Sequence, residues 1–128
     1  MLEKAVLGYP FLLMQPAKLN LEKLPASSGD DVVTRLNGKL SLETVHNFIE
    51  AMRPEPAPHL VLDMSGVSFL DSAGVGALVS LFVSRRNNGK SFALAGLDTH
   101  GMAVLQVAGL TKLLPNFPTV EAALAAKN

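Results

Sequence analysis

The chain has 128 residues, which suits one domain built around a single hydrophobic core. Its 11 basic side chains balance 11 acidic ones, so no field of one sign is available to attract nucleic acid or an anionic membrane. Neither is therefore expected as a partner. The absence of cysteine excludes disulfides and thiolate metal sites, and it fits a reducing compartment such as the cytoplasm.

Residues 1–18 are interpreted as an N-terminal extension, and residues 19–128 as one domain. The apolar run Ala5–Met14 has the length of a signal-peptide core, but Glu3 precedes it and Pro10 interrupts it. It is too short to span a bilayer. Two interpretations of Leu2–Met14 stay open: extra packing on the core, or a contact that forms a homodimer or larger assembly.

The first part of the domain shows strand patterns and then a helix pattern. Leu19–Leu24 alternates as a half-buried strand does, and β-branched Val32–Leu36 is expected to form a hairpin with it, ending at Asn37-Gly38. Ser41 is expected to cap a helix that Pro54 ends. Apolar residues at helical spacing predict its buried face: Val45, Phe48, Ile49 and Met52.

The centre of the chain predicts a buried strand followed by a longer helix. His59–Met64 is an apolar run typical of a strand covered on both faces. Ser72 is placed to be the N-cap of a helix over Ala73–Asn88, with Gly89 just beyond its end. The basic residues of its last turn, Arg85 and Arg86, suit the helix dipole. The residues expected to be buried are Val75, Leu78, Val79 and Phe82.

The remaining elements continue the alternation of strands and helices. The sequence predicts a strand over Ser91–Ala95, a helix over His100–Ala108, a short strand at Leu113-Leu114 and a final helix over Val120–Lys127 capped by Thr119. The predicted order is β-β-α-β-α-β-α-β-α. This order indicates an α/β fold with a mixed sheet of four to five strands, largely parallel.

The stretch after the central strand is unusual because two glycines occur in the first turn of a helix. Each glycine in a helix costs about 1 kcal/mol against alanine. The run Ala73-Gly74-Val75-Gly76 leaves the Ser72 hydroxyl open to an approaching protein.

A strand, then Asp71-Ser72-Ala73-Gly74-Val75-Gly76, then a helix resembles the STAS domain, and in particular the bacterial anti-sigma factor antagonists. The resemblance runs from about Leu19 to the C-terminus and implies the same order of elements. In that family a partner kinase phosphorylates the serine directly after the aspartate. The matching residue is Ser72, and the resemblance gives Asp71 the role of positioning it.

A second segment, Asn37-Gly38-Lys39-Leu40-Ser41, resembles the Gly-Glu-Leu-Asp loop that lies beside the phosphorylation site in this family. Lys39 replaces an acidic residue there, and Ser41 replaces the aspartate. Ala73 stands where many members have a second hydroxyl residue. The resemblance implies a partner-binding set of Asn37, Gly38, Lys39, Leu40, Ser41, Asp71, Ala73, Gly74, Val75 and Gly76.

The function implied by the resemblance is a non-enzymatic switch. The unphosphorylated chain would bind an anti-sigma factor serine kinase and free a sigma factor, phosphorylation of Ser72 would end the contact, and a serine phosphatase would reset it. ATP would belong to the kinase, so no cofactor is expected in this chain. Phosphate adds about −1.5 to −2 charges, which a partner burying this turn would have to desolvate.

Two other functions are weighed against this one. A scaffold or sensory assembly protein of the same fold would use Ser72 only as a helix cap. A serine hydrolase is a distant third, because Leu70 stands at the first glycine of Gly-x-Ser-x-Gly. A triad would also need a histidine and an acid from later loops, and His100 and Asp98 are the only such pair after Ser72. His46, His59 and His100 show no metal-ligand spacing.

Overall fold

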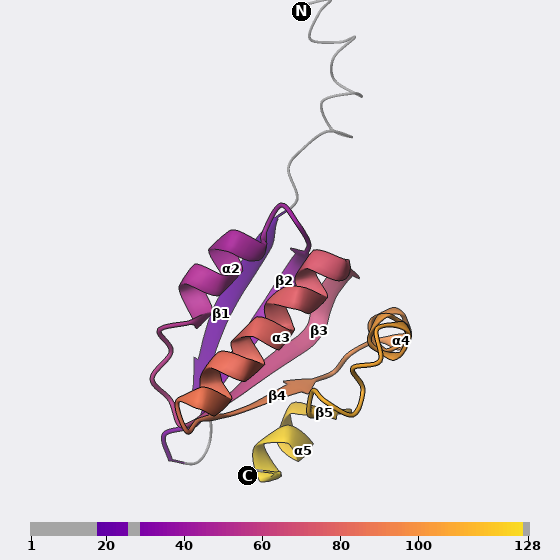
Figure 1. Ribbon diagram of the computed structural model, residues 1–128. Coiled ribbons are helices and arrows are strands. Elements are labelled where there is room, and N and C mark those ends of the chain that lie inside the picture. The colour runs from indigo at the N-terminus through magenta and orange to yellow at the C-terminus, as the bar shows by residue number, and fades with distance from the viewer. Residues whose placement is uncertain (1–17, 26–28, 127–128) are drawn as a thin grey trace, which may run out of the picture.

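The domain is built on one mixed sheet, which the computed structural model describes together with its helices over residues 18–25 and 29–126. The sheet has five strands in the order β1-β2-β3-β4-β5 (Figure 1). β1 and β2 are antiparallel, and every later neighbour is parallel. The predicted α/β class and element order are confirmed. The strand bounds are Leu19–Pro25, Val32–Leu40, His59–Leu70, Ser91–Ala95 and Asn116–Phe117.

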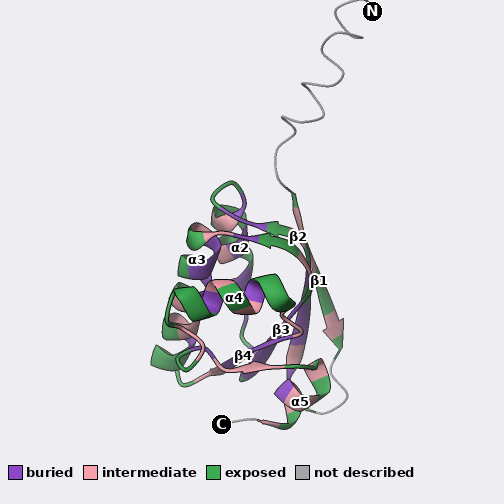
Figure 2. Ribbon diagram, turned by 90° about the vertical axis from the view of Figure 1, so that its right-hand side faces the viewer, coloured by how far each residue is buried: buried purple, intermediate pink, exposed green. Residues whose placement is uncertain are grey.

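Helices cover both faces of this sheet. The helices are α2 (Val45–Met52), α3 (Ser72–Asn87), α4 (Thr99–Val107) and α5 (Val120–Ala125). Successive side chains of a strand point to opposite faces, so each strand supplies two cores. In β3, Leu60, Leu62 and Met64 join the larger core beneath α2 and α3, whereas Val61 joins a smaller core with Ala123 of α5. Because both of its faces are covered, every residue of β3 from His59 to Met64 is buried, whereas much of α4 at the surface is exposed (Figure 2).

Two strands run further than the sequence predicted. β2 passes through Asn37-Gly38 to Leu40, with shifts of register on both sides of Gly38. Gly38 has φ +120°, and a Cβ there would lie 2.1 Å from the carbonyl oxygen of Lys18. Asn37-Gly38 is therefore an irregularity within a strand rather than its end. β3 extends past Met64 to Leu70 because β2 remains beside it and supplies hydrogen-bond partners beyond the end of β4.

The start of α2 differs from the predicted cap at Ser41. Thr44 precedes the helix, and its hydroxyl accepts a hydrogen bond from the Ser41 N–H (3.0 Å) and donates one to the Lys39 carbonyl (2.8 Å). Ser41 contributes through its backbone, because its carbonyl accepts from the Val45 N–H at 2.9 Å. The prediction that the Ser41 side chain caps α2 is wrong. Phe48 and Met52 are buried as predicted, and Val45 and Ile49 are partly buried against the same core.

The C-terminal half largely follows the prediction. α4 begins at Thr99, one residue earlier than expected, and Thr119 caps α5 by accepting from the Ala122 N–H at 3.1 Å. The last strand lies at Asn116–Phe117 rather than Leu113-Leu114, because Leu114 is fully buried in the core. The predicted end of α5 at Lys127 lies outside the described residues, as does the extension over residues 1–17.

Arg85 is a buried structural residue rather than a surface cation at the end of a helix. Its side chain donates to the backbone carbonyls of Ser91 (2.9 Å), Glu55 (3.2 Å) and Ala57 (2.6 Å). Burial lowers the pKa of Arg85, and the charge of Glu55 raises it in partial compensation. Arg85 therefore joins the end of α3 to the segment that leads into β3. None of the described helices is long and apolar enough to cross a membrane.

Candidate functional site

Asp71, and not Ser72, caps α3. The Asp71 residue has extended backbone geometry, and its Oδ1 accepts a hydrogen bond from the Gly74 N–H at 2.9 Å. Its Oδ2 accepts from the Leu42 N–H at 3.1 Å, across to the loop that follows β2. The prediction of Ser72 as N-cap is therefore wrong by one residue. Asp71 stabilises the helix start and also connects it to a neighbouring loop.

Ser72 is the first residue of α3, and its side chain is exposed. Among the described residues its hydroxyl makes no hydrogen bond, so the fold does not use this group. The first turn of a helix carries free backbone N–H groups and a partial positive charge, which favour an anion at this position. A negatively charged group on Ser72 is thus compatible with the helix.

The two glycines of the first turn have different surroundings. A Cβ on Gly74 would lie 2.3 Å from the Leu40 carbonyl oxygen, so only glycine lets α3 approach the end of β2 this closely. A Cβ on Gly76 would meet nothing within 4 Å. Gly74 therefore serves packing, whereas Gly76 leaves open surface beside Ser72.

The structure brings the two motifs together at one edge of the sheet. β2 and β3 are parallel neighbours, with Lys39 paired to Phe69 and Leu40 paired to Leu70, so the segments that follow them are adjacent. The residues of the predicted partner set differ in exposure. Those at the surface are Asn37, Lys39 and Gly76, as is the predicted phosphorylation site Ser72; those that are half-buried are Gly38, Asp71 and Ala73, and those that are buried are Leu40, Ser41, Gly74 and Val75.

Two exposed apolar residues at this edge were not predicted from the sequence. Leu42 is 74% exposed and Phe69 is 43% exposed. Both line a hollow of about 240 Å³ together with Lys39, Ser41 and Asp71. Leu42 stands three residues before Val45, at the spacing of the apolar face of α2, so periodicity alone gave no sign that it is exposed. Phe69 precedes buried Leu70 in a strand and therefore points to the other face.

On its other side, Ser72 borders an apolar groove between α3 and α4. The groove has a volume of about 620 Å³, and its apolar lining includes Val75, Val79, Val104 and Val107. This region also bears on the serine hydrolase alternative, which needs His100 and Asp98 beside Ser72. His100 lines the same groove, but the Asp98 carboxylate caps α4 by accepting from the Gly101 N–H at 2.7 Å. Within the described part of the chain, no group of three His, Asp or Glu side chains could hold a metal ion.

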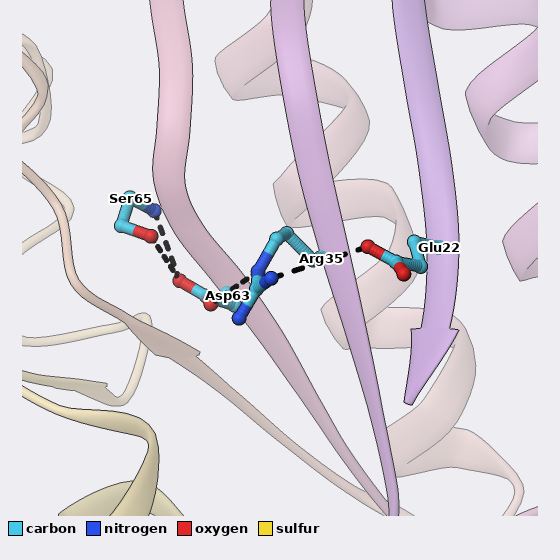
Figure 3. A network of polar contacts seen from close by, with 4 residues as sticks. All are labelled: Glu22, Arg35, Asp63 and Ser65. Atoms are coloured by element: carbon cyan, nitrogen blue, oxygen red, sulfur yellow. Dashed lines mark hydrogen bonds and ion pairs between the residues drawn. The ribbon is translucent and has the colours of Figure 1, made fainter. Parts of the chain in front are cut away.

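A separate polar cluster, shown in Figure 3, joins β1, β2 and β3 away from Ser72. The Asp63 carboxylate is buried; it accepts from the Ser65 N–H (3.0 Å), the Ser65 hydroxyl (2.7 Å) and the Arg35 Nε (3.1 Å). Burial by itself raises the pKa of Asp63, but the hydrogen bonds from Ser65 and the charge of Arg35 outweigh it, so the pKa is lowered. Glu22 is the outer partner of Arg35, at 4.0 Å. This cluster stabilises strand pairing.

A five-stranded mixed sheet with an aspartate-capped helix after its central strand is a known protein architecture. The family model of the STAS domain matches residues 23–123 of this chain. The chain therefore belongs to the STAS domain family.

Relatives within this family have been named for their function. The chain is 25% identical over 88 residues to an anti-sigma F factor antagonist from Paenibacillus polymyxa, covering 66% of this chain and 75% of the relative. Its fold is similar to that of an anti-sigma factor antagonist from Mycobacterium paratuberculosis, with a TM-score of 0.74, 23% identity, and coverage of 86% and 94% of the two chains. The unphosphorylated form of the antagonist SpoIIAA is similar at a TM-score of 0.67 and 22% identity, over 84% and 93% of the two chains.

Proposed function

We propose that this chain is an anti-sigma factor antagonist that acts as a phosphorylation-switched binding protein, with Ser72 as the phosphorylated residue. The observation that carries the proposal is the state of the Ser72 side chain. It is exposed on the first turn of α3, and its hydroxyl makes no hydrogen bond within the described part of the chain. A serine whose only role was to cap the helix would accept a hydrogen bond from the first turn through that hydroxyl. Here the Asp71 carboxylate accepts that bond instead.

The partner surface in this proposal is the edge where β2 and β3 end. Asp71 connects its two halves, so the loop after β2 and the start of α3 present one continuous surface. Leu42 and Phe69 supply apolar contact area there, and removing apolar surface from water favours association. Lys39 supplies a positive charge beside them.

The unphosphorylated surface binds a kinase-type anti-sigma factor and thereby frees a sigma factor. Phosphorylation adds about −1.5 to −2 charges at Ser72, beside the carboxylate of Asp71. A partner that buries this turn must then desolvate the added charge, and each 1.4 kcal/mol lost weakens binding about tenfold. The helix N-terminus accommodates the phosphate, so binding changes while the fold persists.

The comparisons support this proposal at the level of the family. Relatives of this chain are named anti-sigma factor antagonists, and SpoIIAA from Bacillus has been solved in a phosphorylated form as well. In the proposed cycle the kinase holds the ATP, a serine phosphatase removes the phosphate, and the whole exchange takes place in the cytoplasm. This chain contributes binding and needs no cofactor of its own.

The two departures in the loop after β2 differ in their consequence. Ser41 is 6% exposed, so the residue that replaces an aspartate changes little of the surface charge. Lys39 is exposed and places a cation where the family motif is acidic. We expect the matching surface of the anti-sigma factor to carry a carboxylate opposite Lys39, and that charge pairing would select this partner among related kinases.

The first experiment is mass spectrometry of the protein isolated from its host, growing and stressed. A phosphate on Ser72 whose occupancy changes with condition supports the switch. Co-purification with wild-type and Ser72→Asp chains then tests the partner. Ser72→Asp should lose a kinase-type anti-sigma factor that wild type retains, while Ser80→Asp, an exposed serine further along α3, should retain it. An unmodified Ser72 and equal recovery by both variants would favour a scaffold that does not switch.

A further inference from the structure

An apolar groove lies between α3 and α4, with Ser72 at its border. It has a volume of about 620 Å³ and is open to solvent along α4. Val107 lines it and is 92% exposed, more than any other large hydrophobic residue within residues 18–25 and 29–126. Gly76 forms part of its floor, where a Cβ would meet nothing within 4 Å. An apolar surface of this kind generally marks a contact site.

The chain itself contains an apolar segment among the residues that the structure does not describe. Ala5–Met14 includes Val6, Leu7, Phe11, Leu12 and Leu13 and carries no charge. Residues 15–18 separate it from the start of β1. The lining of the groove also carries no carboxylate, lysine or arginine, so segment and groove match in polarity.

The segment joins the sheet at Lys18, at the same end of the sheet as the start of α3, so the groove is within its reach. The Lys18 carbonyl accepts a hydrogen bond from the Lys39 N–H at 2.8 Å, and Lys39 is paired with Phe69, three residues before Ser72. Neighbouring strands lie about 4.8 Å apart, so crossing β2 and β3 from Lys18 requires roughly 10 Å. Residues 14–17 can span about 13 Å when extended, at roughly 3.3 Å per residue. Along α3, the groove runs from Ser72 to Val79, a helical rise of about 10 Å.

We propose that Ala5–Met14 docks in the α3–α4 groove of its own chain and covers Ser72 when it does so. The short connection raises the effective concentration of the segment at the groove to the millimolar range, so a weak apolar contact is populated. The regulatory consequence rests on the proposed function of Ser72: a docked segment competes with the anti-sigma factor for the surface beside α3. The docking itself does not depend on that function.

The sequence provides a reporter for this docking. Tyr9 lies within the segment, and the chain has one tyrosine and no tryptophan, so its tyrosine fluorescence comes from the segment alone. Acrylamide quenching of Tyr9 is measured in the full chain and in a free peptide of residues 1–18. We expect slower quenching in the full chain than in the peptide. Val107→Asp and Ala103→Asp, both at exposed groove positions, should restore quenching to that of the peptide.

The control is Val83→Asp, an exposed apolar residue of α3 that does not line the groove. It should leave the quenching of Tyr9 as in wild type. Circular dichroism checks that each variant is folded. Quenching as fast in the wild-type chain as in the peptide would overturn the proposal. Protection lost equally in Val83→Asp and Val107→Asp would do so too, because the segment would then lie elsewhere.

Dilution distinguishes the chain's own groove from that of a second copy. Protection that is constant over a wide range of protein concentration supports docking within one chain. Protection that falls on dilution, together with a dimer in analytical ultracentrifugation, would overturn it in favour of exchange between two copies. None of these measurements involves the kinase or a phosphate on Ser72, so this proposal and the proposed function can fail separately.

Discussion

The carboxylate of Asp71 accepts a hydrogen bond from the backbone N–H of Leu42 at 3.1 Å, across a separation of 29 residues in the chain. The other oxygen of the same carboxylate caps α3 through Gly74. One side chain thus holds the loop after β2 against the helix that begins with Ser72. A partner that binds here would therefore contact the loop after β2 and the start of α3 in a fixed arrangement.

Asp71→Ala should destabilise the protein by about 1–2 kcal/mol, the usual cost of losing an N-cap side chain. Asp71→Asn should recover part of that loss, because its carbonyl oxygen can still accept from Gly74. Ser72→Ala should change stability by less than about 0.5 kcal/mol, since the hydroxyl makes no hydrogen bond among the described residues. Urea unfolding at neutral pH measures all three. A cost for Ser72→Ala equal to that of Asp71→Ala would contradict the capping geometry.

The two glycines of α3 should respond oppositely to alanine. Gly74→Ala places a Cβ 2.3 Å from the Leu40 carbonyl oxygen and 2.9 Å from Leu70 Cδ1, so the helix must move from the sheet and stability should fall by about 1–3 kcal/mol. Gly76→Ala meets nothing within 4 Å and should stabilise the helix by up to about 1 kcal/mol. Thermal unfolding of the two variants gives the comparison, and a shift of the same sign in both would refute this account.

Arg85 and Arg86 are adjacent but should differ strongly on replacement. Arg85→Met leaves the buried carbonyls of Glu55, Ala57 and Ser91 without their donor, and should cost about 3 kcal/mol or more because each unpaired buried group costs about 1–3 kcal/mol. Arg86→Met alters an exposed residue and should stay within about 0.5 kcal/mol of wild type. Chemical denaturation of both variants tests the difference. Similar midpoints would show that the Arg85 contacts contribute little.

Asp63 should make stability depend on acid pH. Its pKa is lowered in the folded state, so the folded protein binds fewer protons there than the unfolded chain, whose ordinary value is 3.8. The contribution of Asp63 is therefore present above that ordinary value and is lost as the pH falls through the lowered folded value. The Arg35 side chain is partly exposed, so solvent screens part of its attraction to the Asp63 carboxylate.

The measurement compares wild type with Asp63→Asn by urea unfolding at a series of pH values from 7 down to the acid limit of folding. Wild type should be the more stable at neutral pH, and the difference should narrow at acid pH. Asp30→Asn, at an exposed turn, serves as the control and should show a difference that stays small throughout. A gap for Asp63→Asn that stays constant with pH would argue against a lowered pKa.

The misassigned cap shows where sequence patterns stop being informative. Aspartate and serine are both strong N-cap residues, so adjacent Asp71 and Ser72 fit the start of α3 equally well by type. Asp71 is preferred because its second oxygen finds the Leu42 N–H, a partner that only the pairing of β2 with β3 brings near. The choice between the two residues frees Ser72 for another role, so the error bears directly on function.

Local patterns were sufficient for the order of strands and helices, the mixed sheet and most of the buried residues of α2 and α3, because periodicity reports which face of an element is apolar. Together with the family resemblance, they also indicated Asp71 and Ser72 as the centre of the proposed site. Tertiary structure decided the length of β3, the burial of Arg85, the exposure of Leu42 and Phe69, and the groove beside Ser72. Each of these depends on which distant segment lies alongside, and that pairing is not encoded in any single window of the chain.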